Sequence, residues 1–109
     1  MNKNQLQQGD VTLRRVSQIP RAAKAVKPGS RGIVLAEGEA TGHAHRVKAR
    51  RGITLHKIDG LLFFENSTKT PAIVEHEEHK PVSIPPGIWQ VGQVREYDYL
   101  QQMERAVVD

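Results

Sequence analysis

Cysteine is absent from the 109-residue sequence, so disulfide bonds and thiolate metal ligands are both excluded. A metal ion could be bound only by His, Asp and Glu side chains. Such donors suit a Zn, Fe, Mn, Ni or Cu ion, and they cannot form the cysteine-ligated type of structural zinc site. Aromatic residues are scarce at 5%, and all of them follow residue 57. The first half of the chain therefore offers no aromatic ring on which a nucleic-acid base could stack.

Long hydrophobic segments are absent as well. The longest apolar runs, such as residues 61–64, are far shorter than the roughly 20 residues of a transmembrane helix. Residues 2–8 are polar and lack the apolar segment of a secretory signal. We therefore expect a cytoplasmic protein with no membrane partner, and the length indicates one domain with a single core.

Positive and negative charges are unevenly distributed along the chain. Residues 1–57 contain 12 Lys and Arg against 3 Asp and Glu, whereas residues 58–109 contain 4 against 9. The basic half could bind nucleic acid or another acidic partner, and the two halves could equally attract each other within one chain or between subunits. A homo-oligomer is the partner that we expect, and simple solvation of these charges is the alternative.

Short apolar segments separated by turn signals predict an all-β fold, a small sandwich or barrel of about seven or eight short strands. Residues 1–9 are expected to form a loose N-terminus, and residues 20–31 a long basic loop around a marginal helix. A short C-terminal helix is predicted over residues 98–108. Residues 32–36 are apolar on both faces, which is typical of a central strand. The expected strands are residues 10–16, 32–36, 43–49, 53–58, 61–65, 72–76, 82–84 and 88–96.

The dipeptide Asp59-Gly60 is the strongest hairpin signal in the chain. It separates two alternating apolar segments and favours a two-residue type I′ turn. With such a turn Ile58 pairs with Leu61, and His56 pairs with Phe63. Packing against that neighbour is a sufficient role for His56.

His43 and His45 stand two positions apart on a predicted strand. Alternate residues of a strand share a face, so both imidazoles should project inward with Val47. Their Cβ atoms would lie about 6.5–7 Å apart, and a nitrogen of each ring could reach about 2.0–2.1 Å from one metal ion. The spacing predicts a divalent transition-metal site, most simply Zn, Fe, Mn or Ni, whose other ligands come from another strand.

Residues 75–79 are the expected source of those other ligands, because histidines cluster nowhere else. His76 is favoured if the strand stays regular, since it shares a face with Val74, whereas His79 would serve if the chain bends. Hydrogen-bonded structural histidines or a proton-linked switch are the alternatives for the same residues. Three carboxylates are candidates for a metal ligand or for orienting an imidazole: Glu75, Glu77 and Glu78.

The histidine pair also carries a resemblance to a known family. Gly38, His43, His45 and Gly52 resemble the first motif of the cupin superfamily of small β-barrels, and Pro85-Pro86-Gly87 resembles the turn of the second motif. No glutamate follows His45 and no histidine follows Gly87, where the cupin pattern has them. The resemblance implies a cupin-like or jelly-roll-like fold with a metal on His43 and His45, and it does not extend to the remaining ligands.

Whether such a site catalyses a reaction is not decided by the sequence. An open coordination position would allow oxygen or hydrolytic chemistry, whereas a closed site would be structural. Two alternatives belong to other classes: a structural or assembly protein that self-associates, and a nucleic-acid-binding module that contacts only the phosphate backbone. The residues that such a module would use lie on the outer face of the 43–49 strand and at its end: Arg46, Lys48, Arg50 and Arg51.

Overall fold

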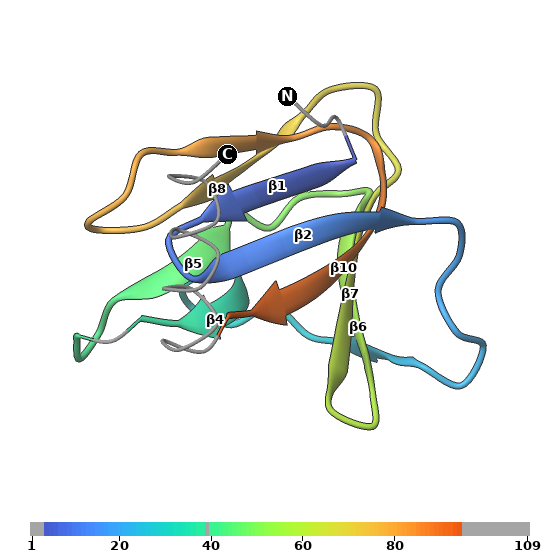
Figure 1. Cartoon of the computed structure of the whole chain (residues 1–109). Helices are drawn as coiled ribbons and strands as arrows, with labels where there is room; N and C mark the ends of the chain where they lie inside the picture. Colours follow the sequence, from blue (N-terminus) through green and yellow to red (C-terminus); the bar gives the residue numbers. More distant parts are fainter. Residues whose placement is uncertain (1–3, 39, 95–109) are drawn as a thin grey trace, which may run out of the picture.

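The computed structural model describes residues 4–38 and 40–94, which form ten strands in two antiparallel sheets (Figure 1). The six-stranded sheet contains, in spatial order, β1 (Gln5–Gln8), β2 (Val11–Val16), β10 (Gly87–Gln93), β7 (Leu61–Asn66), β6 (Ile53–Ile58) and β3 (Lys24–Val26). The four-stranded sheet contains β4 (Ile33–Glu37), β5 (Ala44–Val47), β8 (Ala72–Glu75) and β9 (Val82–Ile84). This architecture confirms the expected all-β, sandwich-like class. The predicted C-terminal helix lies outside the described residues.

The core forms because alternate strand residues from both sheets point inward. Leu13 of β2 and Trp89 of β10 are fully buried on one sheet, and Val47 and Val74 face them from the other. Trp89 keeps its indole N–H satisfied by donating to the carbonyl of Pro85 at 3.1 Å. No helix within the two described ranges is long and apolar enough to cross a membrane.

The β6–β7 hairpin has the predicted turn and register. Ile58 pairs with Leu61 and His56 with Phe63. Asp59 and Gly60 both have positive φ, 49° and 80°, as a type I′ turn requires. The local turn signal was therefore sufficient to place this element.

Three expectations about the strands were wrong. Residues 5–8 form β1 rather than a loose end, because the Gly9-Asp10 turn folds them back on β2. Residues 24–26 form β3 along the free edge of β6 instead of helix, since Pro20 and Pro28 leave too few residues for a stable isolated helix. β4 lies at the edge of its sheet, not at the centre, and only β5 pairs with it. The apolar residues on both of its faces are buried or partly buried by packing, without a second neighbouring strand.

The two sheets meet along the side where β1 lies next to β9, the unlabelled orange strand in Figure 1. Gln8, at the end of β1, is 2% exposed and reaches across to the four-stranded sheet. Its side-chain amide donates to the carbonyls of Val74 and Lys80, at 3.0 and 2.9 Å. Gln8 therefore ties the end of β1 on this side of the sandwich to β8 and to the chain that follows β8.

Candidate functional site

The pairing of β5 with β8 determines which histidines meet. Arg46 lies opposite Glu75 and Val47 opposite Val74 in this antiparallel pair. The same register, extended by one residue, brings His45 next to His76, which follows the end of β8. The chain then bends at residues 77–79 and returns towards β9. A bend here is the condition under which His79 was expected to face the site.

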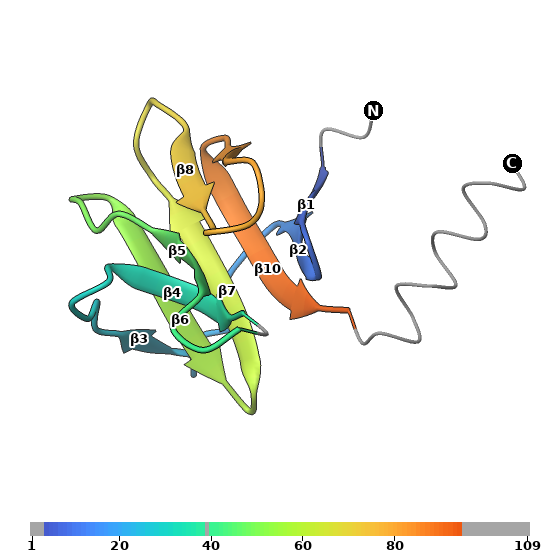
Figure 2. The same ribbon diagram turned by 90° about the vertical axis from the view of Figure 1, so that its left-hand side faces the viewer.

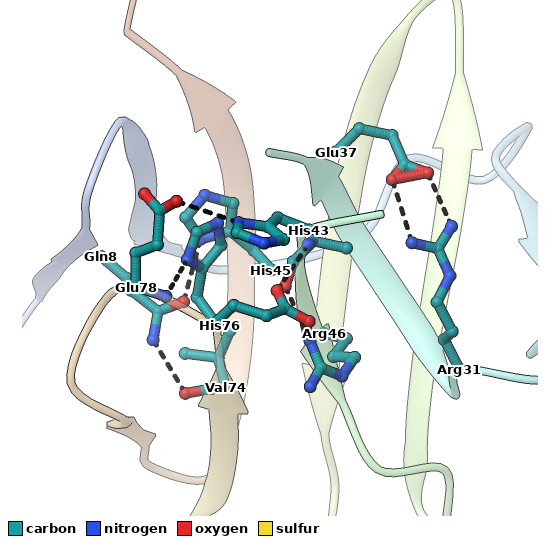
Figure 3. A network of polar contacts seen from close by, with 11 residues as sticks. Gln8, Arg31, Glu37, His43, His45, Arg46, Val74, His76 and Glu78 are labelled. Atoms are coloured by element: carbon teal, nitrogen blue, oxygen red, sulfur yellow. Dashed lines mark hydrogen bonds and ion pairs between the residues drawn. The ribbon is translucent and has the colours of Figure 1, made fainter. Parts of the chain in front are cut away.

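All four histidines proposed as ligands lie together in the structure (Figure 3 labels three of them). The ring centroid of His76 is 4.3 Å from that of His45, 4.8 Å from that of His79 and 5.9 Å from that of His43. The rings of His45 and His79 are nearly parallel, with centroids 6.0 Å apart. We call these four side chains the histidine cluster. Both His76 and His79 therefore lie close to His45, and position alone does not separate the two candidates.

Two glycines make room for the cluster. A Cβ atom on Gly9 would lie 2.5 Å from Nε2 of His79, and one on Gly38 would lie 2.8 Å from Nε2 of His76. Both distances are well below van der Waals contact. The His79 ring can thus approach the backbone of Gly9, and the His76 ring that of Gly38, only because glycine has no side chain.

Gln8 fixes the proton on the most buried histidine. His45 is 1% exposed, and its Nδ1 lies 2.9 Å from Oε1 of Gln8. The orientation of the Gln8 amide is itself fixed, because its nitrogen donates to two backbone carbonyls. Oε1 must therefore accept, so Nδ1 of His45 carries a hydrogen and donates it.

The other nitrogen of His45 faces a carboxylate that sequence reasoning missed. Nε2 lies 3.2 Å from Oδ1 of Asp10, and Oδ2 of Asp10 accepts a hydrogen bond from Gln93 at 2.8 Å. Gly-Asp between two strand-like segments is itself a hairpin signal, and it would have placed residues 8–11 in a turn. No local pattern indicates that this turn meets a histidine 35 positions later in the chain.

The surroundings of His45 disfavour its cationic form. Burial lowers its pKa below 6.5, and the nearby His76 and His79 lower it further, while the Asp10 carboxylate acts in the opposite direction. The net direction is downward. In the metal-free protein a neutral imidazole is thus favoured more strongly at this position than in the unfolded chain.

The three glutamates differ in what they contact. The carboxylate of Glu77 accepts the Ala44 N–H at 3.0 Å and pairs with Arg46 at 2.7 Å, so it ties the turn after β8 to β5. The Ala44 hydrogen bond is the main reason that the pKa of Glu77 falls to about 2. Glu78 lies 3.1 Å from Nδ1 of His43, outside hydrogen-bond geometry. Glu75 lines a groove on the outer surface instead of facing the cluster.

The side chains as they stand do not form a coordination shell. Within residues 4–38 and 40–94, no three His, Asp or Glu side chains have donor atoms arranged to hold an ion. His45 and Asp10 supply two convergent donors, whereas Nδ1 of His76 accepts the Glu78 N–H at 3.0 Å. His79 shows no hydrogen bond to any described residue. His56 stands apart, with Nε2 3.0 Å from Oγ1 of Thr54.

The basic residues considered for nucleic-acid binding lie away from the histidine cluster. Lys48, Arg50 and Arg51 are exposed. Arg46 is paired with Glu77, and Arg50 donates to the carbonyl of Pro71, so two of the four cations already have partners. Phosphate binding at this face stays a prediction. A groove of about 470 Å³ on this side is lined by Gly29, Ser30, Arg31, Gly32, Arg46, Lys48, Ala49 and Glu75.

Comparisons with known proteins identify a family but no activity. The family model described as a domain of unknown function, DUF8820, matches residues 7–94. No curated protein matches the chain, and no solved structure matches it. The matched segment contains all four residues of the histidine cluster together with Gln8 and Asp10. The cupin resemblance stays a prediction.

Proposed function

We propose that this chain, which belongs to the DUF8820 family, binds a divalent transition-metal ion at the histidine cluster. The observation that carries the proposal is the contact among four imidazole rings, one of them 1% exposed, at centroid distances of 4.3 to 6.0 Å. His45 belongs to β5, His43 directly precedes this strand, and His76 and His79 follow β8. Their agreement with the set expected from spacing alone supports a shared role.

A metal ion explains why so many imidazoles share one place. Protonated rings at these distances would repel one another, and neutral rings present lone pairs that few donors in the cluster can satisfy. A divalent cation is the partner that several imidazole nitrogens can share. Nε2 of His45 is already freed for this purpose, because the hydrogen sits on Nδ1.

His79 is the second ligand that we favour. Neither of its nitrogens is hydrogen-bonded to a described residue, and its ring centroid lies 6.0 Å from that of His45. His76 would have to release the Glu78 N–H before its Nδ1 could coordinate. His43 lines a surface pocket of about 470 Å³ together with Arg31, so molecules from solvent can reach the edge of the cluster.

Metal analysis of untagged protein is the direct test. We expect about one Zn, Fe, Mn or Ni ion per chain after purification, or after reconstitution of chelator-treated protein, with a rise in Tm on binding. Co²⁺ gives a visible absorption band on imidazole ligands and serves as the probe for titrations. His45→Gln and His79→Gln should each weaken Co²⁺ binding by at least about tenfold.

His56→Gln is the matched control, because it makes the same chemical change at a histidine outside the cluster. It should leave Co²⁺ affinity unchanged. Less than about 0.1 ion per chain, together with no change in Tm on adding Zn²⁺, Mn²⁺ or Ni²⁺, would contradict the proposal, since a ligand of the folded state must stabilise it.

A further inference from the structure

The carboxylate that faces the most buried imidazole is not one of the glutamates suggested by the sequence, of which Glu78 approaches only the more exposed His43. Glu77 is engaged by the Ala44 N–H and Arg46, and Glu75 lies on the outer surface. Asp10 is the carboxylate that faces the most buried imidazole, with Oδ1 3.2 Å from Nε2 of His45. It comes from the β1–β2 turn, on the opposite sheet from both histidine segments.

The contact between Asp10 and His45 needs a cation. Nδ1 of His45 donates to Gln8, so the lone pair of the neutral ring is on Nε2 and points at a carboxylate oxygen. Two acceptors face each other there, and His45 is too buried for water to separate them. Either a proton or a metal ion must lie between these two atoms.

The separation of the two atoms fits shared coordination. Donors that each lie about 2.0–2.2 Å from one ion stand roughly 2.8–3.6 Å apart, depending on whether the angle at the ion is octahedral or tetrahedral. The observed 3.2 Å lies within that interval. The carboxylate is also held in place, because Gln93 donates to its other oxygen at 2.8 Å.

We propose that Asp10 is a ligand of the metal bound by His45 and His79, and that Gln8 is a positioning residue that keeps Nε2 of His45 free to coordinate. The inference rests on the proposed function. It assigns the site a mixed nitrogen and oxygen donor set, which suits Zn²⁺, Fe²⁺ or Mn²⁺ better than Cu⁺. His79 lies over Gly9, next to Asp10 in the sequence, and its ring has to reorient to supply a third donor to the same ion.

Asp10→Asn tests the ligand with little change in shape. We expect the affinity for Zn²⁺ and Mn²⁺ to fall at least tenfold, with Co²⁺ absorption reduced in parallel. Asp59→Asn is the matched control, because it makes the same change in the turn of the other hairpin, at a φ of 49° that Asn tolerates. This control should bind like the wild type.

A measurement on the wild-type protein tests the same ligand without requiring that the Asp10→Asn variant fold. The side-chain carboxyl ¹³C resonance of Asp10 should shift on saturation with Zn²⁺, whereas that of Asp59 should stay in place. Suppose that the wild type binds metal, that its Asp10 resonance does not shift, and that Asp10→Asn binds with unchanged affinity. This result would overturn the inference and leave the proposed function standing. A wild type that binds no ion overturns both.

Gln8 is tested by the tautomer that it imposes. Ring ¹⁵N shifts at about pH 8, above the usual pKa of histidine, should show His45 with its hydrogen on Nδ1. In Gln8→Met the hydrogen should redistribute towards Nε2, and metal affinity should fall about 10- to 100-fold. Loss of packing alone would not move the tautomer ratio. Both nitrogens protonated in the wild type, or an unchanged ratio in the variant, would contradict the assigned role.

Discussion

At position 9 a methyl group would stand where the structure places the tip of the His79 ring. Gly9 has a φ of 58° and Gly42 a φ of 84°, so alanine is strained at both sites, by about 1–2 kcal/mol. Only at Gly9 does the new Cβ meet a ring, because nothing lies within 4 Å of a Cβ at Gly42. His79 can swing away at little cost, so the two variants should lose similar stability.

Their metal binding should differ. Gly9→Ala should weaken Co²⁺ binding at least about tenfold by displacing His79, and Gly42→Ala should bind as the wild type does. Urea unfolding of the metal-free variants and Co²⁺ titration of both provide the comparison. Equal affinity in the two variants would show that His79 does not contribute to the site.

His45 gives the metal-free protein a defined response to acid. Its pKa is lowered in the folded state, chiefly by burial, so the unfolded chain takes up this proton at a higher pH. The free energy of unfolding should therefore decrease as the pH falls through about 6.5 and level off below the folded-state pKa. Urea unfolding of chelator-treated protein across this interval measures the effect, and His45→Gln should flatten it. A profile as steep in His45→Gln as in His56→Gln would contradict the assignment.

At the level of strands and turns, Glu77 joins the turn after β8 to β5. Its pKa of about 2 means that the stabilisation is complete above the unfolded value of about 4.5 and is lost as the pH falls towards 2. Glu77→Gln should remove this acid-dependent component but keep an acceptor for the Ala44 N–H, whereas Glu77→Ala removes both.

Hydrogen exchange at Ala44 separates the two effects. The Ala44 amide should exchange faster in Glu77→Ala than in Glu77→Gln, since only the alanine variant leaves the Ala44 N–H without its side-chain acceptor. Glu65→Gln on β7 is the control and should change neither exchange nor acid response. Slow exchange in Glu77→Ala would mean that another group protects Ala44.

Local signals predicted some strands and missed others for physical reasons. The β6–β7 hairpin was predictable because its turn residues and alternation lie within a dozen positions. β3 was not, because its three residues are all exposed and form a strand only where the edge of β6 offers backbone partners. His45 was predictable as an inward residue of β5. Asp10 was not, because its meeting with His45 depends on how the two sheets are packed.

For the whole molecule, the expected self-association now has a location to test. β3 and β4 end their respective sheets, and no described strand pairs with the outer edge of either (Figure 2). Such edges favour pairing with a second copy, and the unequal charge of the two halves would make that pairing sensitive to salt. Light scattering at low and high ionic strength should show an oligomer that weakens with salt. A monomer at every concentration would contradict this expectation.

The bridge that Gln8 makes to Val74 and Lys80 spans 66 and 72 positions of the chain. Contacts of such sequence separation require loop closure on the scale of most of the protein, so we expect them to form late in folding. The proposed metal site includes residues joined by this bridge, so we expect it to be absent from the transition state. Zn²⁺ is then expected to slow unfolding and leave the refolding rate unchanged. The ion would lengthen the lifetime of the folded chain without helping the chain to reach its fold.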